Sequence, residues 1–124
     1  MDIYKPHQIG IDAELDACRY LLKKGYTLLD KNYSCKQGEI DLIMQDQDDI
    51  VFVEVRIRHN IAFGNALESI TRSKMNKLIR AATHFLQEKK WLYKVNSRFD
   101  VIAIQPVKGE MRLEWLKNAF TVDR

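Results

Sequence analysis

The chain has 124 residues, of which 46% are hydrophobic and 30% charged, and its formal net charge is +3. This length fits a single domain over residues 1–124 with its own core, and the composition excludes disordered, collagen-like and coiled-coil proteins. Two cysteines without a Cys-x-x-Cys motif exclude a disulfide framework. No segment approaches the ~20 apolar residues of a membrane span, and the first residues do not resemble a signal peptide. We therefore expect a cytoplasmic protein that makes no contact with a membrane.

The first predicted element is a helix over residues 10–24, which Gly25 ends. Its apolar residues recur at helical spacing and define the predicted core face, which consists of Ile11, Leu15, Cys18 and Leu22. Glu14 lies about 60° from the centre of this face on a helical wheel. It can therefore either reach inward from the edge of the core or remain in solvent.

Three strands are predicted next, over residues 26–33, 38–45 and 50–58. The acidic and polar residues 46–49 form the turn between the second and the third strand. A turn that is symmetrical about Gln47 and Asp48 places Asp41 opposite Glu54. The same register places Glu39 opposite Arg56.

A loop over residues 59–65 and a long helix over residues 66–89 follow. The apolar stripe of this helix consists of Leu67, Ile70, Leu78, Ala81 and Phe85, and it also contains Lys74. Lys74 lies within about 20° of the stripe's axis, so its amine can reach the sheet or extend past its neighbours to water. A fourth strand over residues 97–105, which Pro106 ends, and a fifth over residues 111–116 complete the chain.

This order of elements predicts an α/β fold. The long helix is the natural right-handed crossover between the third and the fourth strand, which makes those two strands parallel. The resulting sheet is mixed, because it combines an antiparallel meander with a parallel fourth strand. Helices flank it on both faces in a three-layer sandwich.

Asp41 and Glu54 are the principal candidates for a functional site. Residues directly opposed on antiparallel strands have Cβ atoms about 4.5–5.5 Å apart, and like charges at that distance are destabilising. Glu54 also lies in an apolar run typical of a strand buried on both faces, so desolvation adds to the cost. Either one carboxyl group keeps its proton or a divalent cation binds, and Mg²⁺ commonly takes one or two carboxylates. The alternative is that both acids face solvent and only keep the hairpin soluble.

Residues 38–43 (GEIDLI) and residues 52–56 (FVEVR) resemble the core motif of the PD-(D/E)XK nuclease superfamily. More narrowly, the chain resembles the YraN-like family of uncharacterised bacterial proteins, which is related to archaeal Holliday junction resolvases. Weaker matches follow in the same order along the chain, at Gly10, Ala13, Glu14, Ala17, Phe63, Gly64, Lys74 and residues 98–101. The resemblance therefore covers nearly the whole chain and implies a restriction endonuclease-like fold.

The resemblance also implies an activity, which is metal-dependent hydrolysis of phosphodiester bonds in DNA, including branched or junction DNA. In the superfamily, the acids in the positions of Asp41 and Glu54 bind Mg²⁺ (or Mn²⁺), and a glutamate of the first helix, here Glu14, often completes the site. The metal polarises the scissile phosphate and lowers the pKa of a bound water. Because resolvases act as dimers on two-fold symmetric junctions, a homodimer is a further expectation.

Arg56 departs from the superfamily motif, which has a lysine in this position. Arginine stays protonated, so it can hold a phosphate but is a poor proton acceptor. Either Arg56 pairs with Glu39 and the site hydrolyses weakly or not at all, or Lys74 supplies the missing amine. The sequence thus leaves three hypotheses, namely an endonuclease, a nucleic-acid-binding protein without hydrolysis, and an interaction protein that keeps only the fold.

Two further groups of charges remain open. Lys77 and Arg80 lie on one exposed flank of the long helix, where they suit phosphate contacts or simply form a solvated face. Asp100, at the start of the fourth strand, is either an ion-pair partner of Arg98 or a member of the site.

Overall fold

The computed structural model describes residues 6–58 and 70–120, without the side chains of residues 6–10, 106, 107 and 111. The described part contains helices α1 (Pro6–Lys23) and α2 (Arg72–Glu88). Its strands are β1 (Thr27–Cys35), β2 (Gly38–Asp46), β3 (Asp49–Ile57), β4 (Ser97–Val107) and β5 (Glu110–Phe120). Neither described helix combines the length and the apolar character needed to cross a membrane.

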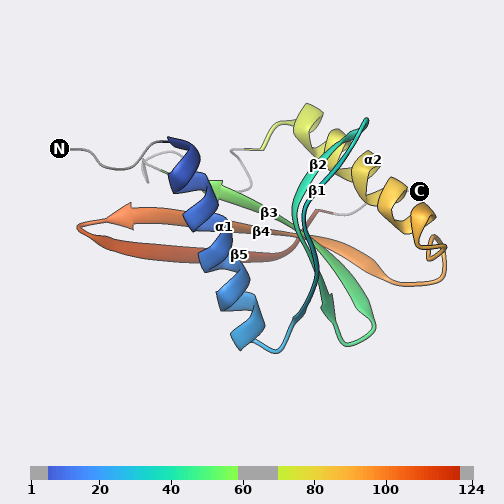
Figure 1. The fold of residues 1–124 in the computed structure, drawn as a ribbon, viewed down its shortest axis with the longest axis horizontal. Helices are drawn as coiled ribbons and strands as arrows, with labels where there is room; N and C mark the ends of the chain where they lie inside the picture. Colours follow the sequence, from blue (N-terminus) through green and yellow to red (C-terminus); the bar gives the residue numbers. More distant parts are fainter. Residues whose placement is uncertain (1–5, 59–69, 121–124) are drawn as a thin grey trace.

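The strands form one mixed sheet in the order β1-β2-β3-β4-β5 (Figure 1). β3 and β4 are parallel, and the other neighbouring strands are antiparallel. α2 lies in the connection between the two parallel strands, as the crossover argument requires. The predicted α/β fold with an antiparallel meander and a parallel fourth strand is therefore confirmed.

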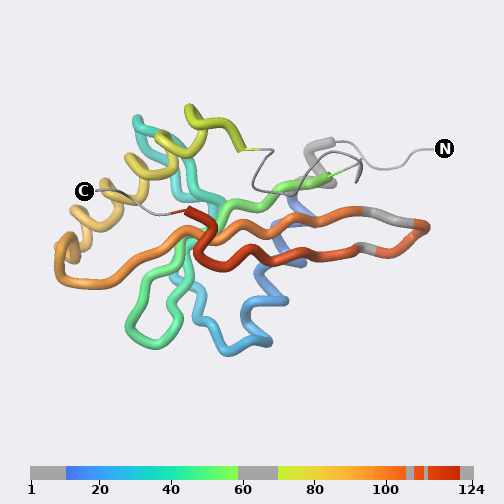
Figure 2. Tube along the Cα trace, turned by 180° about the vertical axis from the view of Figure 1, so that it is seen from behind, coloured from blue at the N-terminus to red at the C-terminus, as the bar shows by residue number. Residues whose placement is uncertain are grey.

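The two helices cover opposite faces of the sheet. The α1 side buries Leu42, Met44, Val51, Val53, Ile102 and Ile104 of the strands. The α2 side buries Ile43, Ile50, Phe52 and Phe99 against Leu78, Ala81 and Phe85 of the helix. This alternation along β2 and β3 produces the three layers seen from the two sides in Figures 1 and 2.

The predicted core face of α1 is wrong for Ile11 and Leu22, whereas Cys18 is buried as predicted. Ile11 and Leu22 are 37% and 46% exposed, and the buried face consists of Ala13, Ala17, Cys18 and Leu21. Small alanine side chains let the helix backbone approach the sheet closely, which outweighs the larger apolar residues on the neighbouring flank. On this corrected face Glu14 lies among the buried positions instead of about 60° away from their centre.

Several predicted boundaries also need correction: α1 begins at Pro6 instead of residue 10, β1 ends at Cys35 instead of residue 33, and β5 ends at Phe120 instead of residue 116. α2 begins at Arg72, because the Thr71 side chain accepts a hydrogen bond from the Lys74 N–H at 3.1 Å and caps the helix there. β4 continues through Pro106 to Val107, since its neighbour β3 ends at Ile57 and leaves a strand edge that tolerates a missing N–H. The predicted loop at 59–65 and the helical positions 66–69 lie outside the described residues.

The predicted register of the β2–β3 hairpin is confirmed over the part of the ladder that pairs. Its pairs run from Asp46–Asp49 to Leu42–Val53. Asp41 and Glu54 follow immediately, at the point where the ladder ends. The sheet is strongly twisted, so that the β1–β2 hairpin is rotated steeply relative to β4 and β5 (Figure 1). The two strands therefore separate at the position of the two acids.

Candidate functional site

Asp41 lies at the fork where β2 separates from β3. Its Oδ2 atom accepts a hydrogen bond of 2.8 Å from the backbone N–H of Val55. In a continuous β2–β3 ladder, this N–H would donate to a backbone carbonyl of β2. Because the two strands separate here, the carboxylate of Asp41 accepts the hydrogen bond instead. The contact fixes the Asp41 side chain against β3 and directs it toward Glu54.

Glu54 is buried, with 4% of its surface exposed. Burial raises the pKa of its carboxyl group to about 8, and a hydrogen bond and charge repulsion from Asp41 act in the same direction. The cations Lys74 and Arg56 act in the opposite direction and lower this pKa. Without a bound cation, Glu54 therefore keeps its proton at neutral pH.

Glu14 of α1 joins the same group. Burial, the charge of Asp41 and a hydrogen bond with Asp41 raise its pKa to about 7, while Asn32 and Lys31 lower it. With its amide nitrogen facing Glu14, Asn32 donates to the two carboxylate oxygens at 3.3 and 3.1 Å. Asp41 is thus in contact with both glutamates, and all three acids predicted from the sequence converge.

Lys74 reaches the site from the other face of the sheet. Its Nζ atom lies 3.5 Å from Glu54 Oε2, and its side chain is 38% exposed. Of the two alternatives for this residue, the structure therefore shows the one in which the amine contacts the acids. The first turn of α2, which Thr71 caps, carries Lys74 to this position.

Arg56 is the second cation beside Glu54. Its Nη1 atom lies 3.9 Å from Glu54 Oε2, the same oxygen that Lys74 contacts. The last backbone pair between β2 and β3 is Leu42–Val53. The expected position of Glu39 opposite Arg56 lies beyond this pair and stays a prediction. The arrangement gives the buried carboxyl group two cationic neighbours from two different elements.

An open cavity of about 320 Å³ gives access to this group of residues. Its lining consists of Ala13, Glu14, Asp41, Val55, Arg56 and Ile57. Two carboxylates facing such a cavity match the needs of Mg²⁺, which binds one or two protein carboxylates and retains several waters. No cluster of three or more His, Cys, Asp or Glu side chains already arranged as a coordination shell occurs within residues 11–58 and 70–120. The donor chemistry fits a divalent cation that displaces the proton of Glu54.

Asp100 belongs to a different part of the molecule. It is fully buried, and its carboxylate accepts hydrogen bonds from Arg98 Nε at 3.1 Å, Trp115 Nε1 at 3.0 Å and the Asn118 N–H at 2.8 Å. Arg98 in turn contacts Asp46 at 3.5 Å. These contacts use the acceptor positions of Asp100 and connect β4 to β5. Of the two alternatives for Asp100, the structure therefore shows the ion pair with Arg98.

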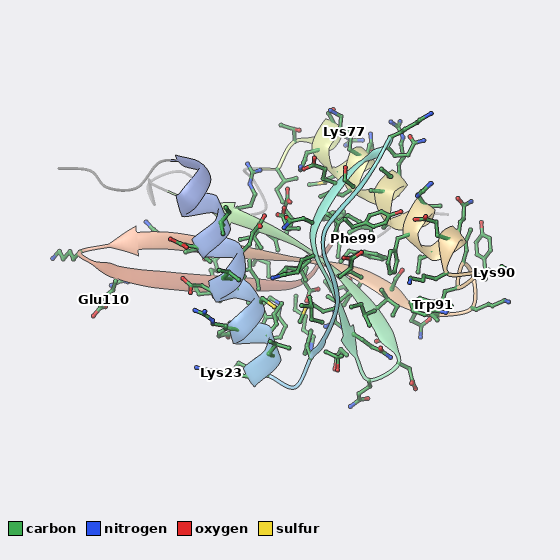
Figure 3. The ribbon with its side chains drawn as sticks, in the orientation of Figure 1. Lys23, Lys77, Lys90, Trp91, Phe99 and Glu110 are labelled. Carbon is green, nitrogen blue, oxygen red and sulfur yellow. The ribbon has the colours of Figure 1, made fainter. Side chains whose placement is uncertain are left out.

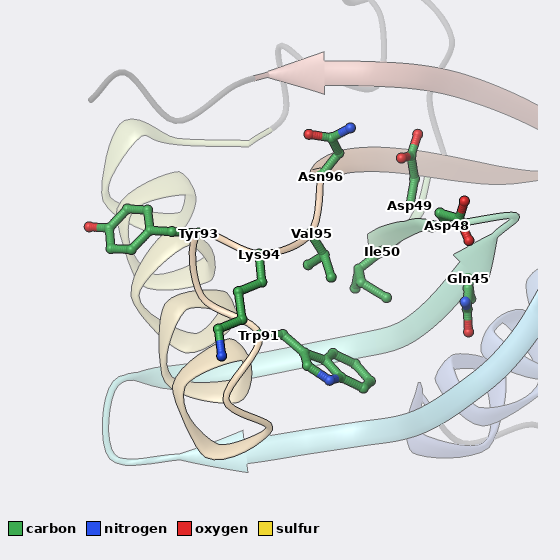
Figure 4. A pocket seen from close by; sticks show the side chains of 9 residues that line it. All are labelled: Gln45, Asp48, Asp49, Ile50, Trp91, Tyr93, Lys94, Val95 and Asn96. Atoms are coloured by element: carbon green, nitrogen blue, oxygen red, sulfur yellow. The ribbon is translucent and has the colours of Figure 1, made fainter.

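A larger cavity, of about 620 Å³, lies at the other end of the β2–β3 hairpin (Figure 4). Its walls come from the β2–β3 turn and from the segment between α2 and β4. Asp48, Asp49 and Lys94 contribute its charges, whereas Tyr93 points away from it and is 80% exposed. None of the five site residues predicted from the sequence lines this cavity, so size alone does not identify the site.

Asn32 is a residue of the site that the sequence did not indicate. It has a φ of 52°, in the left-handed region that asparagine tolerates better than most residues, and it follows a β-bulge in β1. A single asparagine in a polar strand carries no recognisable signal. Its left-handed backbone conformation and its contact with Glu14 are visible only in the folded structure.

Comparison with known proteins places the chain among uncharacterised bacterial proteins. Residues 13–104 match the model of the uncharacterised protein family UPF0102. A UPF0102 protein of Saccharophagus degradans is 49% identical over 119 residues, which cover 96% of this chain and 98% of the relative. Relatives from Nitrosococcus oceani and Coxiella burnetii are 46% and 43% identical, over 92% and 94% of both chains in each pair. These matches confirm the predicted family resemblance.

Proposed function

The chain belongs to the uncharacterised protein family UPF0102, and we propose that it is a Mg²⁺- or Mn²⁺-dependent endonuclease that hydrolyses phosphodiester bonds in DNA, including branched or junction DNA. One observation carries the proposal. Three carboxyl groups, two of which have a raised pKa, meet two cations at the fork between β2 and β3. Glu14 and Asp41 line an open cavity, and Glu54 is buried beside them. Perturbed acids next to a cavity are typical of functional sites.

Each residue has a chemical role in this proposal. Asp41 and Glu54, assisted by Glu14, would hold the metal, which supplies positive charge to polarise the phosphate and to lower the pKa of a bound water. Asn32 holds Glu14 in place through its amide nitrogen. Arg56 offers a planar guanidinium suited to a non-bridging phosphate oxygen.

Lys74 compensates for the departure of Arg56 from the superfamily motif. Its amine lies 3.5 Å from the motif glutamate, although it comes from α2 instead of β3. A cation there can orient the attacking water and stabilise the negative charge that develops on the phosphate. The position of this amine favours an active nuclease over an inactive protein in which the motif lysine has been lost and not replaced.

The direct test is cleavage of end-labelled four-way junction, flap and linear duplex DNA with Mg²⁺ or Mn²⁺. We expect cleavage by the wild type and a loss of at least about 100-fold in Asp41→Asn and Glu54→Gln, which keep the side-chain shapes. Glu114→Gln is the matched control, because it removes an exposed acid from β5 that does not line the cavity of the acids. Cleavage that survives in both site variants, or an inactive wild type, contradicts the proposal.

The second candidate is a nucleic-acid-binding protein without hydrolysis, which the guanidinium of Arg56 in the motif position favours. It predicts salt-dependent DNA binding without turnover and no cleavage by Arg56→Lys. The Lys74→Met variant separates the two candidates. A nuclease loses cleavage when this amine is removed and retains most of its DNA affinity, whereas a binding protein shows only the change in affinity.

A further inference from the structure

A third cavity, of about 320 Å³, lies between the β1–β2 turn and α2. Its lining consists of Gln37, Ile79, Arg80, Thr83, His84 and Gln87, and it shares no residue with the cavity of the acids. Thr83 donates its hydroxyl to the carbonyl of Ile79 at 2.9 Å, so that donor is already used. Arg80 and His84, one helical turn apart on the same flank, contribute a guanidinium and an imidazole group to its lining.

His84 is held from behind by two partners. Its Nδ1 atom lies 2.6 Å from the Tyr33 hydroxyl and 3.2 Å from Glu88 Oε1, and Tyr33 also donates to that carboxylate oxygen. Both contacts use the same ring nitrogen. Because the Tyr33 hydroxyl has a single proton, which it donates to Glu88, the proton in the Tyr33–His84 contact lies on Nδ1. The ring is thus held through Nδ1, and His84 lines the cavity beside Arg80.

The β1–β2 turn packs tightly on α2 at this cavity. A Cβ atom on Gly38 would lie 3.1 Å from the carbonyl oxygen of Lys77, so the absence of a side chain allows the close approach. Figure 3 shows Lys77 beside the end of the β1–β2 hairpin. Gln37, in that turn, forms the wall opposite Arg80 and His84. The facing acid, Glu88, is already engaged by Tyr33 and His84.

The cationic residues of α2 form a path from the acids to this cavity. Lys74 contacts Glu54, and Lys77, Arg80 and His84 follow along the helix. Ten residues of helix span about 15 Å, which corresponds to roughly four nucleotide steps of about 3.4 Å along a DNA strand. We infer that the cavity at Arg80 and His84 binds a backbone phosphate of the DNA strand whose scissile phosphate lies at Asp41 and Glu54. This inference rests on the proposed function and adds a substrate-binding subsite to it.

DNA affinity measured by fluorescence anisotropy in EDTA tests the subsite apart from hydrolysis. We expect Arg80→Gln and His84→Gln each to weaken binding of a labelled duplex about five- to tenfold. Loss of one phosphate contact should also reduce the slope of log affinity against log salt by about 0.9. Arg19→Gln is the matched control, since it removes an exposed arginine from α1 on the other face of the sheet, and it should leave affinity and slope unchanged.

Thermal unfolding confirms that each variant is folded before binding is compared. Under the proposed nuclease activity, saturating DNA should restore the cleavage rate of Arg80→Gln, so that KM rises while kcat stays near the wild-type value. Wild-type affinity and slope in both variants overturn the subsite, even if Asp41→Asn abolishes cleavage and so supports the nuclease. DNA binding that depends on Arg80 and His84 supports the subsite even if no DNA is cut, and absence of wild-type DNA binding overturns it.

Discussion

Glu54 makes the stability of the metal-free protein depend on pH in a direction that is unusual for a carboxyl group. Its pKa rises from 4.5 to about 8 on folding, with burial as the main cause, and its side chain is 5% exposed. The folded state therefore binds more protons than the unfolded state between these values. Stability from this group is complete below about pH 4.5 and is lost as the pH rises through about 8. At about 1.4 kcal/mol for each pKa unit, the loss reaches roughly 5 kcal/mol at its upper limit.

Urea unfolding in EDTA at intervals from pH 5 to pH 9 measures this loss. The free energy of unfolding of the wild type should fall by several kcal/mol across the range, whereas Glu54→Gln should remove most of the fall because its amide needs no proton to donate to Asp41. Part of the fall remains in that variant, since burial also raises the pKa of Glu14. Glu114→Gln, which removes an exposed acid from β5, should behave like the wild type. A wild-type stability that is constant or rises from pH 5 to pH 8 refutes the reasoning, as does an equal fall in Glu54→Gln.

Three further predictions follow from the same contacts. In calorimetry at pH 7, Mn²⁺ binding should release protons and raise the unfolding temperature of the wild type, and Asp41→Asn should abolish both effects. Lys74→Met should reduce kcat about 100-fold and move the midpoint of the pH-dependent stability loss upward, because Lys74 lowers the pKa of Glu54; an unchanged midpoint contradicts the ion pair. Asn32→Ala should shift the acidic limb of the kcat/KM profile to higher pH, since Asn32 lowers the pKa of Glu14, and an unshifted limb shows that Glu14 does not need to ionise.

The hairpin could be predicted because short-range rules determine its register, whereas the sequence left two outcomes open for Lys74. Strand alternation and a symmetrical turn fix the β2–β3 register, which the structure confirms from Asp46–Asp49 to Leu42–Val53. A lysine in the apolar stripe of a crossover helix must either contact the sheet or extend to water. Which of these outcomes occurs depends on whether an acid of the sheet, here Glu54, lies within reach of the amine. The apolar pattern of the helix alone does not show this.

The core face of α1 could not be predicted from hydrophobic periodicity. The largest apolar residues of the helix include Ile11 and Leu22, which are partly exposed, whereas Ala13 and Ala17 are completely buried. Periodicity weights residues by hydrophobicity, but close packing against a twisted sheet selects residues by size as well. The same close approach brings Glu14 to Asp41. The position of the third acid therefore follows from how α1 packs on the sheet, which the hydrophobicity of its residues does not predict.

The fork between β2 and β3 explains how residues from both faces of a sheet reach one site. In a continuous ladder, side chains on opposite faces are separated by the backbone, and a residue of α1 cannot contact the group that a residue of α2 contacts. Where the strands separate, the Val55 N–H donates to the carboxylate of Asp41. The backbone of paired strands no longer separates the two faces of the sheet at this point. Glu14 then approaches Asp41 from the α1 side, while Lys74 approaches Glu54 from the α2 side. The twist of the sheet, which the sequence specifies only through the whole fold, is therefore what assembles the proposed site.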